Sequence, residues 1–396
     1  MAKSKKNCNL KFSWRPNLIY PLQFILWTTL RRIDTTLLES EFNFSTSLLF
    51  TIVMFASEFF AGLLLFLYQR RNINKTKIKE NTKDLLIYRE NTLSRPDRPL
   101  KIFFLLFMTS YFDFISFIML SNYIPQYENA SGSLEKRIEG MLTISSALFF
   151  YYILRFPIYK HQFYSLIVIG ICLITVIGTE FGFQDFSDNF TYIDLIKKIA
   201  LIFVEHIFNS FLDSSEKYVL EYDHVFYATA LAIEGFFGFI TIMIFSISDS
   251  SYIAQVSQIY QENSGGKFAF FIFLIFGYFM LSGGTNTFRV LTNKKYSPTS
   301  KSLVDYLLTP IYLIIDYIFK RDFTRNGEKD PFYFIFNLLL SIMVVLCGCV
   351  YNEVIILFCC GLEGETYDQI SYRSNKNYVQ AVYELNTIDE IPIILE

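Results

Sequence analysis

Two apolar stretches, each about as long as a bilayer is thick, carry a single acid near their centre. Residues 48–67 read LLFTIVMFASEFFAGLLLFL around Glu58, and residues 224–245 read HVFYATALAIEGFFGFITIMIF around Glu234. A helix of roughly 20 apolar residues spans the hydrocarbon core, and a charged carboxylate at its centre costs about 3 kcal/mol on insertion scales. Each acid precedes a Phe pair and a glycine, so we interpret the two stretches as copies in an internal repeat.

Composition places the chain among membrane proteins. Of 396 residues 52% are hydrophobic, with 44 Phe and 27 Tyr, which is far from the composition of a soluble domain. The formal net charge of −2 gives no reason to expect a nucleic-acid partner. Three of the six cysteines, Cys172, Cys347 and Cys349, fall within predicted helices as apolar filler. The chain has no CxxC pair and no histidine cluster, so we predict neither a metal site nor a cofactor.

Hydrophobic runs predict an all-α multi-pass membrane protein with about ten transmembrane helices. The predicted spans are residues 18–38, 48–68, 102–121, 138–153, 163–181, 196–211, 224–245, 268–290, 300–319 and 332–358. The second five resemble the first five in their polar breaks and turns. A unit with an odd number of spans ends on the opposite side of the membrane, so a second copy inserts in the opposite orientation. We therefore predict two inverted five-helix repeats. Such repeats are a recurring basis of alternating access, with the substrate site at the repeat interface.

The distribution of Lys and Arg predicts the orientation, because basic loops stay in the cytosol. The expected order is a basic cytosolic N-terminus at 1–17, a first repeat at 18–182 with a basic cytosolic loop at 69–101, a second repeat at 183–358, and a polar cytosolic tail at 359–396. Three sequons then lie on the non-cytosolic side as candidate glycosylation sites, at Asn43, Asn129 and Asn189. The first span is the least regular, because charges interrupt it at Arg31, Arg32 and Asp34.

Polar residues inside predicted spans are candidates for a substrate cavity. Glu58 and Glu234 are the best pair for a cavity acid or a proton-coupled site, and a structural Glu in a helix bundle is the alternative. Asp113 is a weaker candidate. Another set lies on the sixth span, where Glu205, Asn209 and Asp213 share one face next to His206. That face fits either a polar pathway or an interhelical hydrogen-bond network.

In the eighth span, Asn286 and Arg289 follow the glycine pair Gly283-Gly284. Unwound backbone at such a pair would be available to bind substrate. Close helix packing through small residues is an equally good interpretation of the same pattern. No residue is predicted to be catalytic: the three histidines are scattered, and no compact set typical of a membrane-embedded transferase is present.

Three stretches carry a resemblance to a known family: Ala56–Gly62 (ASEFFAG), Phe288–Phe319 with its Ser-Pro entry into a Pro-containing helix, and Leu346–Leu357. With the ten-span arrangement, they make residues 18–362 resemble the drug/metabolite transporter superfamily, in its EamA-like branches near nucleotide-sugar-transporter-like and chloroquine-resistance-transporter-like proteins. The resemblance is architectural. It implies a secondary transporter that moves a small organic metabolite by alternating access, with a small-molecule substrate and the lipid bilayer as partners.

A non-transporting polytopic scaffold or sensor is the alternative function. The sequence indicates no oligomeric state.

The tail contains Tyr367-Asp-Gln-Ile370 and an acidic dileucine-like end at 389–395, which resemble sorting signals that coat adaptors read in extended form. Chance occurrence is the competing explanation in a chain so rich in Tyr and Ile. On this basis we expect an internal membrane, such as Golgi, endosome or vacuole, rather than the plasma membrane.

Overall fold

The computed structural model describes most of the membrane region of the chain. The described residues are 9–12, 19–42, 44, 47–77, 99–118, 134–154, 158–183, 191–221, 225–247, 251–262, 265–319, 324–325 and 328–358. Among them, helices account for nearly all residues, and the strands are two short antiparallel pairs. Asn43, Asn129 and Asn189, most of the basic loop and the whole polar tail lie outside the described residues.

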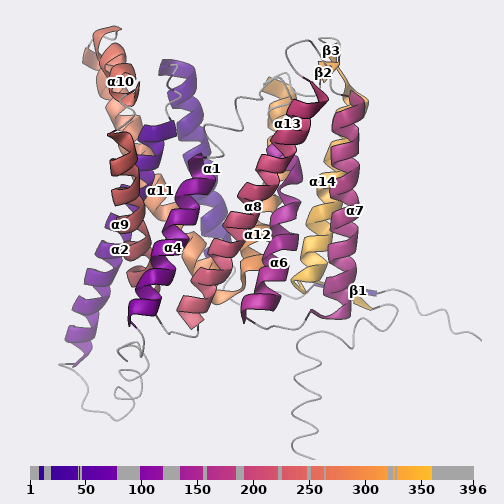
Figure 1. Cartoon of the computed structure of the whole chain (residues 1–396), viewed down its shortest axis with the longest axis horizontal. Coiled ribbons are helices and arrows are strands. Elements are labelled where there is room, and N and C mark those ends of the chain that lie inside the picture. The colour runs from indigo at the N-terminus through magenta and orange to yellow at the C-terminus, as the bar shows by residue number, and fades with distance from the viewer. Residues whose placement is uncertain are drawn as a thin grey trace, which may run out of the picture.

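The helices follow one another along the chain, and the long ones run between the two ends of the molecule (Figure 1). They are α1 (Ile19–Phe42), α2 (Ser47–Lys77), α4 (Pro99–Ile118), α5 (Leu134–Ile138), α6 (Gly140–Leu154), α7 (Lys160–Phe183), α8 (Tyr192–Glu221), α9 (Tyr227–Ser246), α10 (Ser251–Glu262), α11 (Gly265–Lys295), α12 (Pro298–Leu307), α13 (Thr309–Phe319) and α14 (Pro331–Tyr351).

The strands mark the two ends of this bundle. β1 (Asn9–Phe12) pairs with β4 (Ile355–Phe358) next to the lower ends of the helices, and β2 (Thr324–Arg325) pairs with β3 (Glu328–Lys329) at the upper end, where α10 also lies (Figure 1). The β1–β4 pair therefore holds the segment before the first helix against the segment after the last one.

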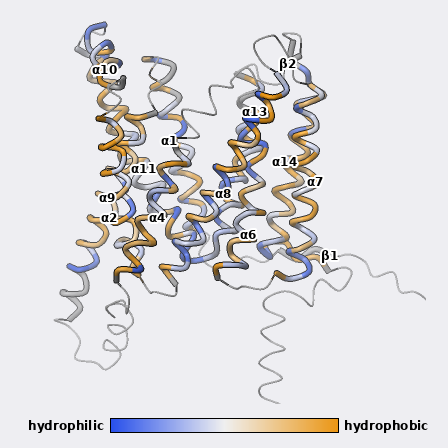
Figure 2. Tube along the Cα trace, viewed as in Figure 1, coloured by the Kyte–Doolittle hydropathy of each residue, from blue (hydrophilic) through white to orange (hydrophobic). Residues whose placement is uncertain are grey.

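Five described helices are long and apolar enough to cross a membrane: those spanning Leu48–Arg71, Lys160–Phe183, Tyr227–Ser246, Gly265–Lys295 and Pro331–Tyr351. Large apolar side chains such as Ile171 and Ile174 of α7 and Leu339 of α14 are exposed on their outer surfaces. Figure 2 shows the hydrophobic colouring along the outer helices. An apolar exterior of this extent is typical of a lipid-facing surface, because water-soluble proteins rarely expose contiguous apolar patches. The fold is that of an all-α membrane protein.

Local chemistry explains where two of the later helices begin. Ser297 caps α12 by accepting a hydrogen bond from Ser300 N at 3.0 Å, with Pro298 at the first helical position. Asp330 caps α14 in the same way, accepting from Phe332 N at 2.9 Å and Tyr333 N at 3.0 Å. Such caps satisfy orphan N–H groups, and proline is tolerated there because its missing N–H has no helical partner.

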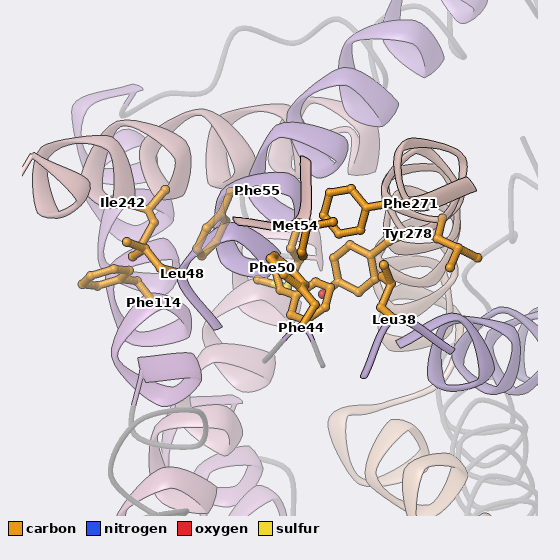
Figure 3. Close-up of a cluster of buried hydrophobic side chains, with 12 residues drawn as sticks. Leu38, Phe44, Leu48, Phe50, Met54, Phe55, Phe114, Ile242, Phe271 and Tyr278 are labelled. Atoms are coloured by element: carbon orange, nitrogen blue, oxygen red, sulfur yellow. The ribbon is translucent and has the colours of Figure 1, made fainter. Parts of the chain in front are cut away.

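Helices that are distant in sequence pack side by side. α2 packs against α9 and α11, α4 against α8 and α9, α1 against α11, α6 against α8 and α12, and α7 against α14. The largest apolar clusters lie at two places. Figure 3 shows one of them, where Phe44, Phe50 and Phe55 from the first part of the chain meet Phe271 and Tyr278 of α11. The other joins α5–α8 with α12 and α14 around Ile169, Leu173 and Val344.

Several predicted boundaries are wrong. The tenth predicted span ran to Phe358, but α14 ends at Tyr351; the chain turns through Glu353, which has a positive φ of 57°, and then forms β4. The amphipathic helix α10 was not predicted. The predicted ninth span is two helices, α12 and α13, separated at Leu308. Pro310, the second residue of α13, has no N–H to continue the helical ladder from α12.

The eighth predicted span contains no unwound segment. α11 is continuous from Gly265 to Lys295 through the glycine pair. A Cβ on Gly284 would come within 2.4 Å of the Trp27 ring, and one on Gly283 within 3.3 Å of the Ser57 backbone oxygen. Of the two interpretations of the pair, the structure supports close helix packing, and the backbone at the pair is helical rather than unwound.

Candidate functional site

The site is built on the crossing of α2 and α9, the two helices that carry the central glutamates. A Cβ on Gly235 would lie 2.3 Å from Phe59 N, and one on Gly62 would lie 2.4 Å from Ala232 N. The backbones therefore meet with no side chain between them, immediately next to Glu58 and Glu234. In the alignment of the two stretches, Gly235 is the counterpart of Phe59. This close approach thus joins equivalent positions of the two predicted copies.

Arg289 of α11 lies among four carboxylates from three other helices. Its guanidinium nitrogens are 3.3 Å from Glu58 Oε1, 3.5 Å from Glu216 Oε2, and 3.7 Å from both Asp213 Oδ1 and Glu234 Oε2. Its side chain is 12% exposed, whereas the four acids are almost completely buried. Four acids share one guanidinium, and the contact with Glu58 also has hydrogen-bond geometry.

A second base extends this group toward α12. Lys301 Nζ lies 2.9 Å from Asp213 Oδ2 and 3.0 Å from Asp305 Oδ2. Asp213 therefore joins Arg289 and Lys301 into one continuous network. We call Glu58, Asp213, Glu216, Glu234, Arg289, Lys301 and Asp305 together the Arg289 network.

Neutral hydrogen-bond donors hold individual acids of the Arg289 network in place. Thr109 Oγ1 of α4 donates to Glu234 Oε1 at 3.0 Å, and Ser110 Oγ donates to the Glu234 backbone oxygen at 2.8 Å. Asn293 Nδ2 of α11 donates to the Asp213 backbone oxygen at 2.8 Å and to Glu216 Oε2 at 3.4 Å. The position of Glu234 is thus determined by two helices, α4 and α9, as well as by Arg289.

The other predicted residues of α4 and α11 lie close by. Asp113 is half-buried on α4 and interacts electrostatically with Arg289, Lys301 and Asp213. Asn286, one turn before Arg289, is buried. The structure therefore brings the acids Glu58, Asp113, Asp213 and Glu234 to Arg289 from five helices in all, α2, α4, α8, α9 and α11. Nothing in the sequence indicates that these acids meet one guanidinium.

A separate polar group lies nearer the N-terminal end of α8 than Asp213 and Glu216 do. It consists of Glu205, His206 and Asn209. Asn209 Nδ2 donates to Glu205 Oε1, and Glu205 Oε2 lies 2.5 Å from His206 Nδ1. His206 interacts electrostatically with Glu139, to which Lys136 Nζ and Thr309 Oγ1 bind at 3.0 and 3.1 Å. Eleven residues separate Glu205 from Glu216, or roughly 16 Å of helix. The predicted polar face of α8 is real, and its two ends belong to two different groups.

A buried arginine that the sequence analysis missed lies in a third place. Arg137 of α5 is fully buried and donates to Glu180 of α7, to the Tyr333 hydroxyl of α14 at 2.8 Å and to Asn337 Oδ1 at 3.3 Å. Tyr333 also donates to Glu180. Glu180, Glu216 and Lys301 were missed as well. Their only signal was a charged residue at the border of an apolar run, which is usually a solvated helix end.

The chemistry available to the Arg289 network is that of fixed charges in a low-dielectric interior. Among the described residues, no group of three or more His, Cys, Asp or Glu side chains is arranged to hold a metal ion.

A comparison with models of protein families finds no match to the chain. A comparison with curated protein sequences finds none either.

Proposed function

We propose that the protein is a secondary transporter that moves a small organic solute across an internal membrane by alternating access. The observation that carries the proposal is the Arg289 network itself. Intramembrane acids and bases are expensive, and where they occur together they usually belong to a substrate or ion pathway. Here they converge from α2, α8, α9, α11 and α12 onto one region between the helices.

The packing of the helices supports an inverted repeat. The predicted repeat matches α1 with α8, α2 with α9, α4 with α11, α5–α6 with α12–α13, and α7 with α14. Exchanging each helix for its counterpart turns the α1–α11 contact into α8–α4 and the α2–α11 contact into α9–α4, and all four contacts occur. The same exchange maps the α2–α9, α7–α14 and α6–α12 contacts onto themselves. A two-fold relation of this kind is what ten spans in two inverted units require.

The position of the Arg289 network also fits alternating access. Its acids Glu58 and Glu234 are counterparts in the two repeats, and they lie on either side of the α2–α9 crossing. A site on the repeat interface is exposed to opposite sides of the membrane when one repeat rocks against the other. Among the predicted residues, Glu58 and Glu234 are therefore the ones we assign to the transport site.

Uptake into proteoliposomes tests the proposal. The purified full-length chain is reconstituted and given a panel of radiolabelled amines, amino acids, sugars and nucleotides. We expect saturable uptake of at least one class, abolished by Arg289→Gln and unchanged by the exposed control Arg71→Gln. Absence of uptake for the whole panel, in vesicles that retain folded protein, would favour a scaffold or sensor.

Tags at the two ends test the topology. An even number of spans places both ends in the cytosol, so both tags should be equally accessible to protease in sealed vesicles. Opposite accessibility would refute the inverted repeat.

The proposal of an internal membrane rests on the tail motifs, and truncation after Glu365 should redistribute the protein if those motifs act.

A further inference from the structure

The Arg289 network carries more negative than positive charge. Among the described residues, two bases form ion pairs with five carboxylates: Arg289 and Lys301 pair with Glu58, Asp213, Glu216, Glu234 and Asp305. Fully ionised, the network would have a formal charge of −3. An uncompensated charge is costly in a buried site, so such a group either takes up protons or binds positive charge from outside.

Four of its carboxylate oxygens, one on each acid around Arg289, lack a hydrogen-bond donor. Within the described part of the chain, no donor lies within hydrogen-bonding distance of Glu58 Oε2, Asp213 Oδ1, Glu216 Oε1 or Glu234 Oε2, and all four atoms are buried. The four side chains are 1%, 0%, 0% and 3% exposed. They come from α2, α8 and α9 and surround the same guanidinium, so their unused acceptors are gathered around one region rather than scattered over the bundle.

This arrangement selects the charge of a ligand. A carboxylate or phosphate would have to compete with four acids for Arg289, and it would add negative charge to a group that already has an excess. A divalent metal requires several oxygens directed at one point, which the described residues do not provide. A protonated amine supplies one positive charge and up to three N–H donors, which these unused acceptors can receive.

We infer that the Arg289 network binds the protonated amine of an organic solute, with Glu58 and Glu234 as its principal acceptors. The inference rests on the proposed transport function and names the chemical class of the substrate. Protons and the amine neutralise the same carboxylates, so they compete. The groups facing these acids are Thr109, Asp113 and Asn293 in addition to the network itself. Amine affinity should therefore fall as the pH is lowered.

The protein contains its own reporter beside this site. Trp27 stacks on Phe288, with ring centroids 6.4 Å apart, and Phe288 directly precedes Arg289. The chain has only two tryptophans, and the other is Trp14. In a Trp14→Phe background, the fluorescence of Trp27 alone reports on α11 next to the Arg289 network.

Equilibrium binding of radiolabelled methylamine to the full-length protein in liposomes is the direct test, and Trp27 fluorescence is the second measurement. We expect saturable binding that weakens at least tenfold in Glu58→Gln and in Glu234→Gln. Glu41→Gln removes an exposed carboxylate from α1 and should leave methylamine affinity unchanged. The Glu→Gln changes keep side-chain size, and gel filtration of each variant verifies that it is folded.

Each result separates the inference from the proposed function. Saturable binding of inorganic phosphate that depends on Arg289, without amine binding, overturns the inference, and uptake of an anionic solute would then leave the transporter proposal intact. A response to Na⁺ or K⁺ alone overturns the amine assignment. Methylamine binding without uptake of any solute keeps the assigned site and overturns transport. No binding of any of these probes by folded protein refutes the inference.

Discussion

Two buried arginines, Arg137 and Arg289, lie in regions that differ in the balance of acidic and basic side chains. Among the described residues, Arg137 donates hydrogen bonds to one carboxylate, that of Glu180, and to two neutral partners, Tyr333 and Asn337. Among the described residues, Arg289 faces four carboxylates, each of which has an oxygen without a hydrogen-bond donor. The first is a balanced pair that joins α5, α7 and α14. The second has an excess of acid at the α2–α9 crossing.

The contrast indicates how buried charge is used in this fold. A balanced, hydrogen-bonded pair gains nothing from a further ligand, so the Arg137 group fits a structural role. An unbalanced group is completed only when protons or a cation arrive. Both regions are expensive to bury. Of the two, the Arg289 network is the one that we propose changes its charge state during a transport cycle.

The largest expected effect is on the balanced pair. Arg137→Met leaves Glu180 buried without its cation, which should lower the free energy of unfolding by about 3–5 kcal/mol. Thermal and denaturant unfolding of the purified protein measures the loss. The exposed Arg71→Met is the matched control and should change stability little. A mild effect of Arg137→Met would mean that the comparison between the two arginines does not hold.

The next largest effect is expected from a steric change where α2 and α9 cross. The Cβ of Gly235→Ala would lie 2.3 Å from Phe59 N, so α2 and α9 must separate. We expect a loss of about 1–3 kcal/mol in stability, together with loss of uptake. Gly178→Ala places its Cβ where nothing lies within 4 Å and should be neutral or slightly stabilising. Equal behaviour of the two glycine variants would contradict the close approach at the crossing.

The sequence predicts the helices far better than the site. Apolar length and a repeated Glu–Phe–Gly pattern place α2, α9 and most other helices, because membrane insertion is decided by local composition. The sequence does not reveal which acids meet, since Glu58 and Arg289 are far apart in the chain and come together only through packing. Lys301 and Glu216 look like ordinary charged residues near helix ends. Arg137 precedes an apolar run, where solvation would be expected.

Acid substitutions in the Arg289 network should affect transport more than stability. Glu58→Gln and Glu234→Gln each reduce the excess negative charge, which offsets the lost contact with Arg289. We expect a change in stability within about 1 kcal/mol and at least a tenfold fall in uptake, the equivalent of about 1.4 kcal/mol in activation free energy. Similar losses for the two variants would support their equivalence in the repeat, and a loss confined to one of them would argue against it.

The last prediction compares one hydrogen bond in each region, and the difference it tests is in uptake rather than in stability. Thr109→Val removes the donor to Glu234 Oε1, and Tyr333→Phe removes a hydroxyl that contacts both Arg137 and Glu180. A hydrogen bond to a charged group contributes about 1.5–3 kcal/mol, so both variants should be measurably less stable in unfolding experiments. Their uptake should differ. Thr109 orients an acid of the transport site, so Thr109→Val should reduce uptake per folded molecule, whereas Tyr333→Phe should leave it unchanged. If Tyr333→Phe also reduces uptake per folded molecule, the Arg137 group takes part in the transport cycle. The distinction between a structural Arg137 and an Arg289 that acts in transport would then be wrong.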